Sequence, residues 1–175
     1  EGELSAAQMA KWRAIQEEFR KNLKAQDEQA VAPMATGAKD IKKEMFSDPI
    51  DFFTADLSFI SILKVLPAVY NTFGKIRGII LVKPQFEAES SQHSKGVVRN
   101  LRDHIDILSR VAAGIIETGF EIEGITYSPV KGPAGNIEFL FLIFKNDAIK
   151  VDSIDKNYWI SRISEIAETA HNVLQ

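Results

Sequence analysis

The 175-residue chain contains no cysteine. This absence excludes a disulfide framework and any metal site built on thiolates, and it is typical of proteins from a reducing cytoplasm. The three histidines, His93, His104 and His171, are far apart in the sequence, which argues against a histidine-rich metal site. We therefore predict a cytoplasmic protein without a metal centre.

Long apolar runs and an excess of one charge are also lacking. The longest runs, such as Phe139 to Phe144, are far shorter than the roughly 20 residues that cross a bilayer, and the amino terminus shows no signal-peptide pattern. A membrane role is therefore not expected. The net charge of −3 means that nucleic-acid binding would need a local basic surface. The apolar share of 45% is that of an ordinary globular domain.

The hydrophobic pattern predicts an α/β fold. Apolar residues at helical spacing predict helices at 5–28, 60–73, 101–118 and 159–173, with a short helical turn at 41–46. Segments rich in apolar residues predict strands at 50–55, 76–82, 120–127 and 137–145. Pro67 is expected to kink its helix, and Gly119 to end the helix before it. The polar segment 83–96 predicts a long loop.

The order of these elements predicts the sheet. Helices separate the first three strands, so right-handed crossovers make those strands parallel. No helix separates the last two strands, so they should form an antiparallel hairpin. We therefore expect parallel strands plus a terminal antiparallel hairpin, flanked by helices.

Three polar segments stand at the ends of the predicted strands. Asp56 follows the first strand, Lys83 follows the second, and Glu138 begins the last. Because the last strand runs backwards, its start lies at the edge where the parallel strands end. That carboxyl edge is where α/β proteins build their sites. The topology alone therefore predicts that the three side chains converge.

Each of these residues also has a plain structural interpretation. A lysine after a strand is usually a solvated end, and a glutamate at a strand start is usually exposed. Asp56 taken alone is better explained as a cap for the following helix. Only the three together favour a site.

Four motifs resemble a known family. They are Asp56-Leu-Ser-Phe-Ile-Ser61, Lys83-Pro-Gln-Phe-Glu-Ala88, Lys95-Gly-Val-Val-Arg99 and Ser128-Pro-Val-Lys-Gly-Pro-Ala-Gly-Asn-Ile-Glu-Phe139. In order and spacing they resemble the hemolysin-A-type (TlyA) ribosomal RNA methyltransferases, which have the FtsJ-like fold. The resemblance runs from about Ala38 to Lys145.

The resemblance implies a Rossmann-like sheet and transfer of a methyl group from S-adenosylmethionine to a ribose 2′-hydroxyl of ribosomal RNA. The family's catalytic Lys-Asp-Lys-Glu set would be represented by Asp56, Lys83 and Glu138. Asp56 and Ser58 stand where the methionine end of the cofactor would lie. Lys83 is the candidate base, since a ribose hydroxyl is a weak nucleophile.

The chain also departs from the family pattern. Between Gly2 and Gly74 it has only Gly37, so the family's Gly-rich cofactor loop and the catalytic lysine before it have no counterpart. Gly96 stands alone where two glycines are usual. We therefore interpret the chain as a partial catalytic domain, the carboxyl-terminal half, with 1–37 an amino-terminal helix and connector, 38–150 the methyltransferase core and 151–175 a carboxyl-terminal helix. The alternative is a catalytically incompetent relic that binds RNA or protein.

Several residues have two interpretations within this resemblance. Arg99 and Lys131 would contact RNA phosphates or simply keep the surface soluble. Phe86 would stack on a base or pack in the core. The segment Gly132 to Gly135 would cradle a phosphate or form a hairpin turn, and the turn is favoured. His104 is expected to be structural.

A half-sheet would leave the strand at 50–55 with an open edge. The first helix would cover that edge, or a second copy of the chain would pair with it in a homodimer. The expected partner is ribosomal RNA or a ribosomal subunit.

Overall fold

A computed structural model describes residues 40–89, 91–145 and 156–174. All of them belong to one unit of the chain, Gly37–Gln175. The predicted helix at 5–28, and with it the predicted cover of the open strand edge, lies outside the described residues.

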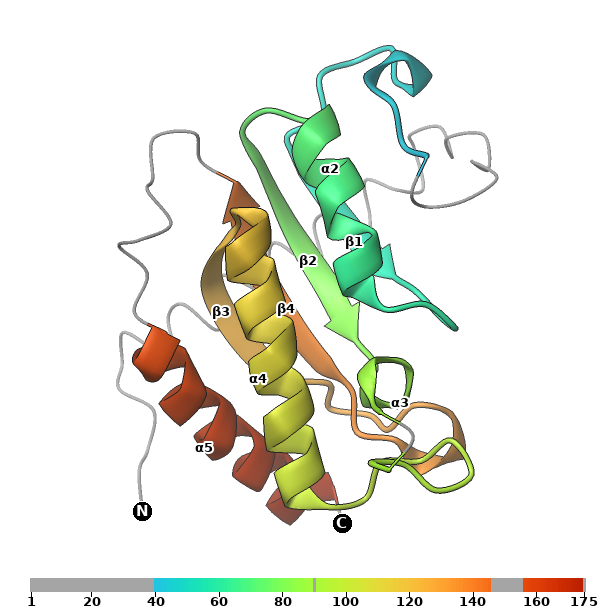
Figure 1. Ribbon diagram of the computed structural model, residues 1–175, viewed down its shortest axis with the longest axis vertical. Coiled ribbons are helices and arrows are strands. Elements are labelled where there is room, and N and C mark those ends of the chain that lie inside the picture. Colours follow the sequence, from blue (N-terminus) through green and yellow to red (C-terminus); the bar gives the residue numbers. More distant parts are fainter. Residues whose placement is uncertain (1–39, 90, 146–155, 175) are drawn as a thin grey trace. The chain divides into compact units, whose positions relative to one another are not determined.

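The described unit contains a four-stranded mixed sheet (Figure 1). Its strands lie in the order β1-β2-β4-β3 and are β1 (Phe52–Asp56), β2 (Ile76–Val82), β4 (Phe139–Lys145) and β3 (Glu121–Tyr127). β1 and β2 are parallel, and β4 is antiparallel to both of its neighbours. The predicted combination of parallel strands and an antiparallel hairpin is therefore confirmed. The insertion of β4 between β2 and β3 goes beyond the prediction.

The helices follow the predicted order with two local differences. They are α2 (Leu66–Thr72), the short α3 (Pro84–Glu87), α4 (Leu101–Thr118) and α5 (Lys156–Leu174), with 3-10 turns η1 (Lys43–Met45), η2 (Ile62–Lys64) and η3 (Pro133–Gly135). The predicted kink at Pro67 is wrong: Pro67 lies in the first turn of α2, where its missing N–H costs nothing. α3 occupies part of the segment predicted as loop. Gly119 ends α4 with φ 105°, as predicted.

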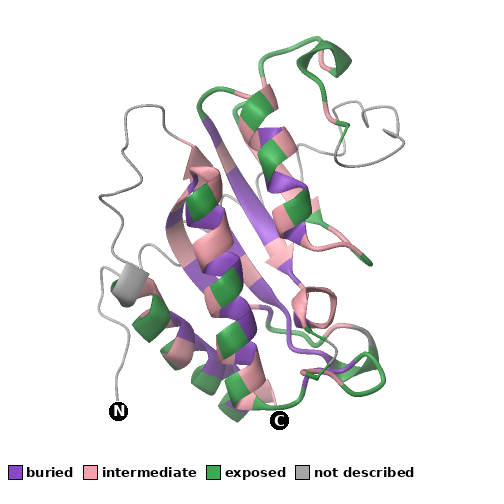
Figure 2. Ribbon diagram, in the orientation of Figure 1, coloured by how far each residue is buried: buried purple, intermediate pink, exposed green. Residues whose placement is uncertain are grey.

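The core forms where α2, α4 and α5 pack against the sheet (Figure 2). Its fully buried side chains include Phe120, Phe139, Phe141, Ile80, Leu108 and Ile115. Each contributes about 1.5–3 kcal/mol of hydrophobic stabilisation, so the packed core fixes the positions of the strand ends. No helix among the described residues has the length and apolarity that a bilayer span requires.

The strand register brings three chain segments to one edge of the sheet. Asp56 pairs with Leu81 across the parallel strands, and Val82 pairs with Phe139 across the antiparallel ones. Lys83 and Glu138 are therefore the next residues beyond that last pair. The edge holds all three of the polar residues that the sequence singles out.

Candidate catalytic site at the carboxyl edge of the sheet

Lys83 and Asp56 form the closest charged pair at this edge. The Lys83 Nζ atom lies 2.6 Å from Asp56 Oδ1, and it also donates to Ser58 Oγ at 3.3 Å. The Lys83 side chain is only 13% exposed, whereas that of Asp56 is 67% exposed. The Lys83 side chain is therefore shielded from water, whereas the carboxylate that pairs with it is exposed.

Glu138 supplies a second carboxyl group, and this one is buried. The residue is 7% exposed, and its Oε1 atom has no hydrogen-bond partner among the described residues. Burial raises the pKa of the Glu138 carboxyl, the charge of Lys83 opposes that shift, and the charge of Asp56 adds to it. The register of β2 and β4 places Glu138 beside Lys83 at the same edge of the sheet. A buried oxygen without a hydrogen-bond partner is unusual in a folded protein, which marks this carboxyl as a candidate for function.

Gly132 makes room for the Glu138 carboxyl. A Cβ atom at position 132 would lie 2.2 Å from Glu138 Oε1 and 2.5 Å from its Cδ. Any side chain there would push the carboxyl group aside. The loop between β3 and β4 therefore contains a glycine because of the site as well as the turn, and η3 provides the predicted turn.

The structure thus brings Asp56, Lys83 and Glu138 together, as the topology predicts. The alternative for Asp56 is not observed: the side chain that caps η2 is Ser61, which accepts the N–H of Leu63 at 3.2 Å. Glu138 is buried rather than exposed. Their catalytic roles stay predictions, because position alone does not test them.

Phe59 belongs to this site, and the sequence analysis misses it. It is 90% exposed and adopts φ 64°, a left-handed conformation that costs a bulky residue about 1–2 kcal/mol. Its ring lies 5.0 Å from that of Phe86, between centroids, at an interplanar angle of 50°. Phe86 therefore packs against another aromatic ring rather than in the main core. An aromatic residue in a polar loop after a strand is the only sequence signal for Phe59.

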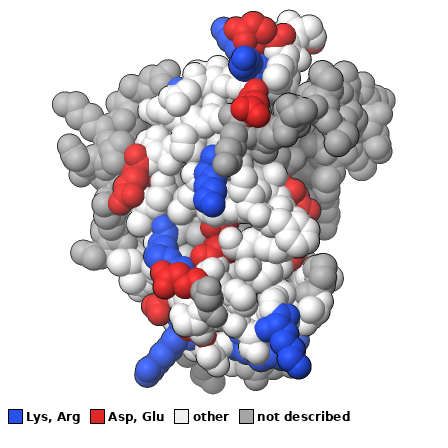
Figure 3. All heavy atoms as spheres, turned by 45° about the vertical axis from the view of Figure 1, so that its right-hand side comes forward, with Lys and Arg blue, Asp and Glu red and all other residues white. Residues whose placement is uncertain are grey.

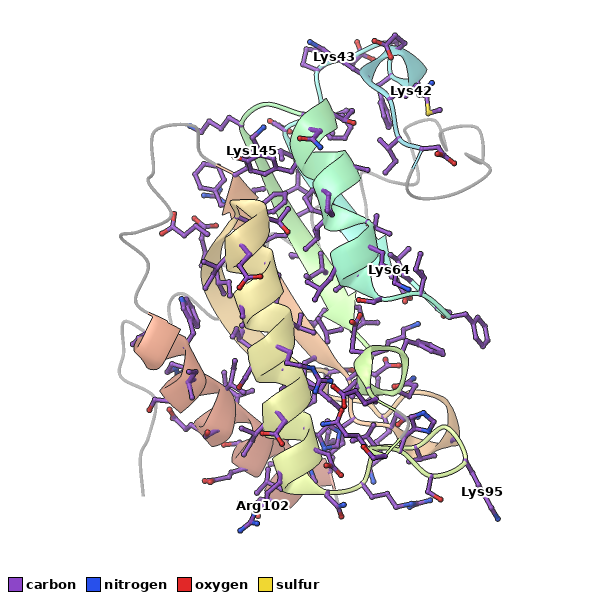
Figure 4. The ribbon with its side chains drawn as sticks, in the orientation of Figure 1. Lys42, Lys43, Lys64, Lys95, Arg102 and Lys145 are labelled. Atoms are coloured by element: carbon purple, nitrogen blue, oxygen red, sulfur yellow. The ribbon has the colours of Figure 1, made fainter. Side chains whose placement is uncertain are left out.

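Basic side chains surround the loops at the same end of the sheet. Lys95, Arg99, Arg102 and Lys131 are all exposed, and none forms an ion pair within the part of the chain that the structure describes. Lys95 occupies the tip of a tight turn with φ 52°, followed by Gly96 with φ 74°. Figure 4 shows Lys95 and Arg102 pointing away from the fold. Figure 3 shows basic side chains at the lower end of the face that it draws, with acidic and basic side chains alternating above them.

Asn136 connects two of these loops. Its side chain donates to Gly96 O at 3.0 Å and accepts the N–H of Val98 at 3.1 Å, while its backbone carbonyl accepts from Gly132 N. The residue is 2% exposed. The turn that carries Lys95 is therefore fastened to the loop that carries Lys131 and Gly132.

His104 is structural, as expected. It is fully buried, its Nδ1 atom lies 3.0 Å from His171 Nε2, and the pair joins α4 to α5. Burial, together with the charge of His171, lowers the pKa of His104 to about 4. No group of three or more potential metal ligands is found in the described ranges.

Known proteins match this chain over most of its length. The family model of FtsJ-like methyltransferases matches residues 6–145. Hemolysin A of Brachyspira hyodysenteriae is 42% identical over 119 residues, which are 65% of this chain and 49% of that protein. The 16S/23S rRNA (cytidine-2′-O)-methyltransferase TlyA of Mycobacterium tuberculosis is 36% identical over 124 residues, 69% of this chain and 46% of that protein.

A solved structure agrees with these matches. That of a hemolysin-like protein from Streptococcus thermophilus superposes with a TM-score of 0.70 at 32% identity, covering 78% of this chain and 48% of that one. The chain thus spans about half the length of the relatives it matches. The family match begins at residue 6, whereas the sequence analysis places the start of the resemblance near Ala38. The chain belongs to the FtsJ-like methyltransferase family, in the branch that contains hemolysin A and TlyA.

Proposed function

We propose that this chain is a catalytic part of an S-adenosylmethionine-dependent methyltransferase that modifies a ribose 2′-hydroxyl of ribosomal RNA. The observation that supports this most directly is the cluster of Lys83, Asp56 and Glu138, with a close ion pair beside an unpartnered buried carboxyl. The names of relatives such as TlyA of Mycobacterium tuberculosis point to the same substrate. A ribosomal target also accords with the expected cytoplasmic location.

The donor fits the chemistry of this edge. When bound, S-adenosylmethionine would supply an electrophilic methyl group on a sulfonium. Asp56 and Ser58 would hold its methionine end, because an exposed carboxylate and a hydroxyl suit an ammonium group. The unpartnered Glu138 Oε1 leaves one acceptor available for the hydroxyl of the acceptor ribose.

Lys83 would contact the reacting hydroxyl. The ribose oxygen would take the methyl group as the hydroxyl proton passes to a base. Asp56, whose Oδ1 atom lies 2.6 Å from Lys83 Nζ, would orient the lysine toward the hydroxyl. Lys83 would act as the base in its neutral amine form, in which its nitrogen has a free lone pair. Glu138 would orient the hydroxyl.

The exposed basic residues and the aromatic pair would bind the RNA. Arg99 and Lys131, which are exposed, would contact phosphates near the site, and Lys95 and Arg102 would extend that basic surface. Phe86 and Phe59 form an aromatic platform on which an unstacked base can lie. The homodimer that the sequence analysis allows is supported by no observation and is not part of this proposal.

Methyl transfer to ribosomal RNA tests the proposal. The chain would be incubated with S-adenosylmethionine and ribosomal subunits, and 2′-O-methylated nucleotides measured by mass spectrometry. We expect Lys83→Ala to lower the rate by about 10²–10⁴-fold, the range for loss of a proton-transfer group. Lys43→Ala is the matched control, since Lys43 is an exposed lysine in η1. Full activity of the Lys83 variant would remove that residue from the mechanism.

The relic is the second candidate function, favoured by the shortage of glycine before Gly74. Such a protein would keep the sheet and bind RNA or protein without holding the cofactor. Calorimetric titration with S-adenosylmethionine separates the two candidates. Binding with a Kd on the order of micromolar supports the enzyme, and no binding at millimolar cofactor supports the relic.

A further inference from the structure

Glu87 joins the two loops that follow β1 and β2. Its Oε1 atom accepts the backbone N–H of Ile62 at 2.8 Å. Burial raises the pKa of this carboxyl, while the neighbouring Ser61 hydroxyl, the Ile62 N–H and the charge of Arg110 oppose the shift. The partly buried Glu87 carboxylate, on the four-residue helix α3, therefore bonds to the loop that follows β1.

Arg110 of α4 holds the Glu87 segment from the other side. Its guanidinium donates to the backbone carbonyl of Glu87 at 3.2 Å and to Gln92 Oε1 at 3.0 Å. It also lies 3.5 Å from the carboxylate of Glu89. Glu87 is therefore presented to the β1 loop from a segment that is held by helix α4.

The loop that Glu87 contacts contains Ser58 and the strained Phe59. Its start is fixed by the ion pair of Asp56 with Lys83, and its end by the bond from Ile62 to Glu87. A left-handed conformation at a bulky residue persists only when the surrounding structure holds it on both sides. The bond from Ile62 to Glu87 is therefore needed to hold the conformation of Phe59 as much as the ion pair of Asp56 with Lys83.

We infer that Glu87 is a positioning residue, whose carboxylate holds the loop Leu57–Ser61 so that Phe59 and Ser58 face the ligands of the site. This inference rests on the proposed function for what the loop binds, but the anchoring itself does not. Glutamine in place of Glu87 keeps one acceptor for Ile62 N–H and loses the charge. Alanine removes the acceptor altogether.

Amide-resolved NMR on the whole chain tests the anchoring without any ligand. In Glu87→Ala we expect hydrogen exchange at the Ile62 amide to become at least tenfold faster, while exchange in β2 stays unchanged. The Ile62 amide shift should titrate in the wild type with a midpoint above the usual glutamate range, and should not titrate in Glu87→Gln. Glu89→Ala, which removes a neighbouring carboxylate near the same arginine, is the matched control and should leave both readings unchanged.

A second measurement addresses function. Affinity for a ribosomal RNA fragment would be measured by fluorescence anisotropy in the wild type, Glu87→Ala, Phe59→Ala and the double variant. We expect both single variants to lose affinity and the double variant to lose no more than Phe59→Ala alone. Additive losses, or an Ile62 amide that stays protected in Glu87→Ala, would overturn the inference. RNA binding that is absent from the wild type would overturn the proposed function while the exchange result still stands.

Discussion

Two lysines at opposite ends of the same sheet have contrasting surroundings. Lys83 follows β2 and meets ionisable groups, with Asp56 at 2.6 Å and the charge of Glu138 nearby. Lys145 ends β4 and donates to two backbone carbonyls, those of Tyr70 and Phe73, both at 2.7 Å. It also lies 4.1 Å above the Tyr70 ring. Figure 4 shows it at the end of the sheet opposite to Lys95.

The contrast is one between the kinds of group that surround the two lysines. The two carbonyls at the end of α2 that bind Lys145 cannot gain or lose a proton, and the helix dipole there also favours a cation. The partners of Lys83 can gain or lose protons, and one of their oxygens has no partner among the described residues. A lysine with titratable partners is suited to chemistry, and a lysine with carbonyl partners to stability.

The largest expected effect is the difference in stability between variants of the two lysines. Lys145→Met should lower the free energy of unfolding by about 2–3 kcal/mol, because it leaves two carbonyls without a charged donor. Lys83→Met should change it by about 0–1 kcal/mol, since Asp56 is largely exposed and water replaces the lysine. Urea denaturation of both variants measures the difference. Equal losses would mean that the two lysines are structural to the same degree.

The buried histidine pair extends the contrast to a group held without charge. The folded pKa of His104 lies at about 4, below its usual value of 6.5, so between these values the unfolded chain binds a proton that the folded chain does not. Its contribution to stability is therefore complete above about pH 6.5 and is lost as the pH falls towards 4. Between pH 7 and 5 this loss amounts to about 2 kcal/mol.

Replacing His104 should remove that pH dependence. We expect the stability of His104→Gln to fall less steeply between pH 7 and 5 than that of the wild type, as measured by urea denaturation at each pH. Gly74→Ala, at a position where nothing lies within 4 Å of the new Cβ, is the control and should keep the wild-type slope. A parallel slope in His104→Gln would show that other groups cause the pH dependence.

A change to the glycine beside the site should act on function more than on the fold. Gly132→Ala would force the Glu138 carboxyl to move, because the new Cβ would lie 2.2 Å from its oxygen. We expect methyl transfer to fall by about tenfold or more, since small displacements of reacting groups are costly. Gly74→Ala is the control, as nothing lies within 4 Å of its Cβ position. Similar activities of the two variants would contradict the role of Glu138.

The smallest effect is a gain in stability. Because burial raises the pKa of Glu138, the folded chain holds that proton more tightly, and the ionised carboxyl reduces stability once the pH rises through the folded pKa. Glu138→Gln should therefore have a higher free energy of unfolding than the wild type at pH 7. The gain should vanish in acid, where the carboxyl is protonated. Calorimetric scans at both pH values measure it.

Part of this architecture could be predicted from local patterns. The end of β2 was predictable because the apolar run Ile79–Val82 stops at the polar Lys83, and Gly119 marks the end of α4. Pro67 was mispredicted, since the same residue either kinks a helix or begins one, depending on where the hydrogen bonds of that helix start. The conformation of Phe59 could not be predicted, because the bonds that impose its positive φ come from distant residues.

The sequence by itself determined the elements, the parallel and antiparallel directions of the strands, and the edge at which Asp56, Lys83 and Glu138 would stand. These follow from periodicity and chain connectivity, which are local properties. Only the tertiary structure decided that β4 lies directly beside β2, which places Glu138 next to Lys83, and that Glu138 is buried. Strand order and burial depend on how distant side chains pack together, and no short stretch of sequence encodes that.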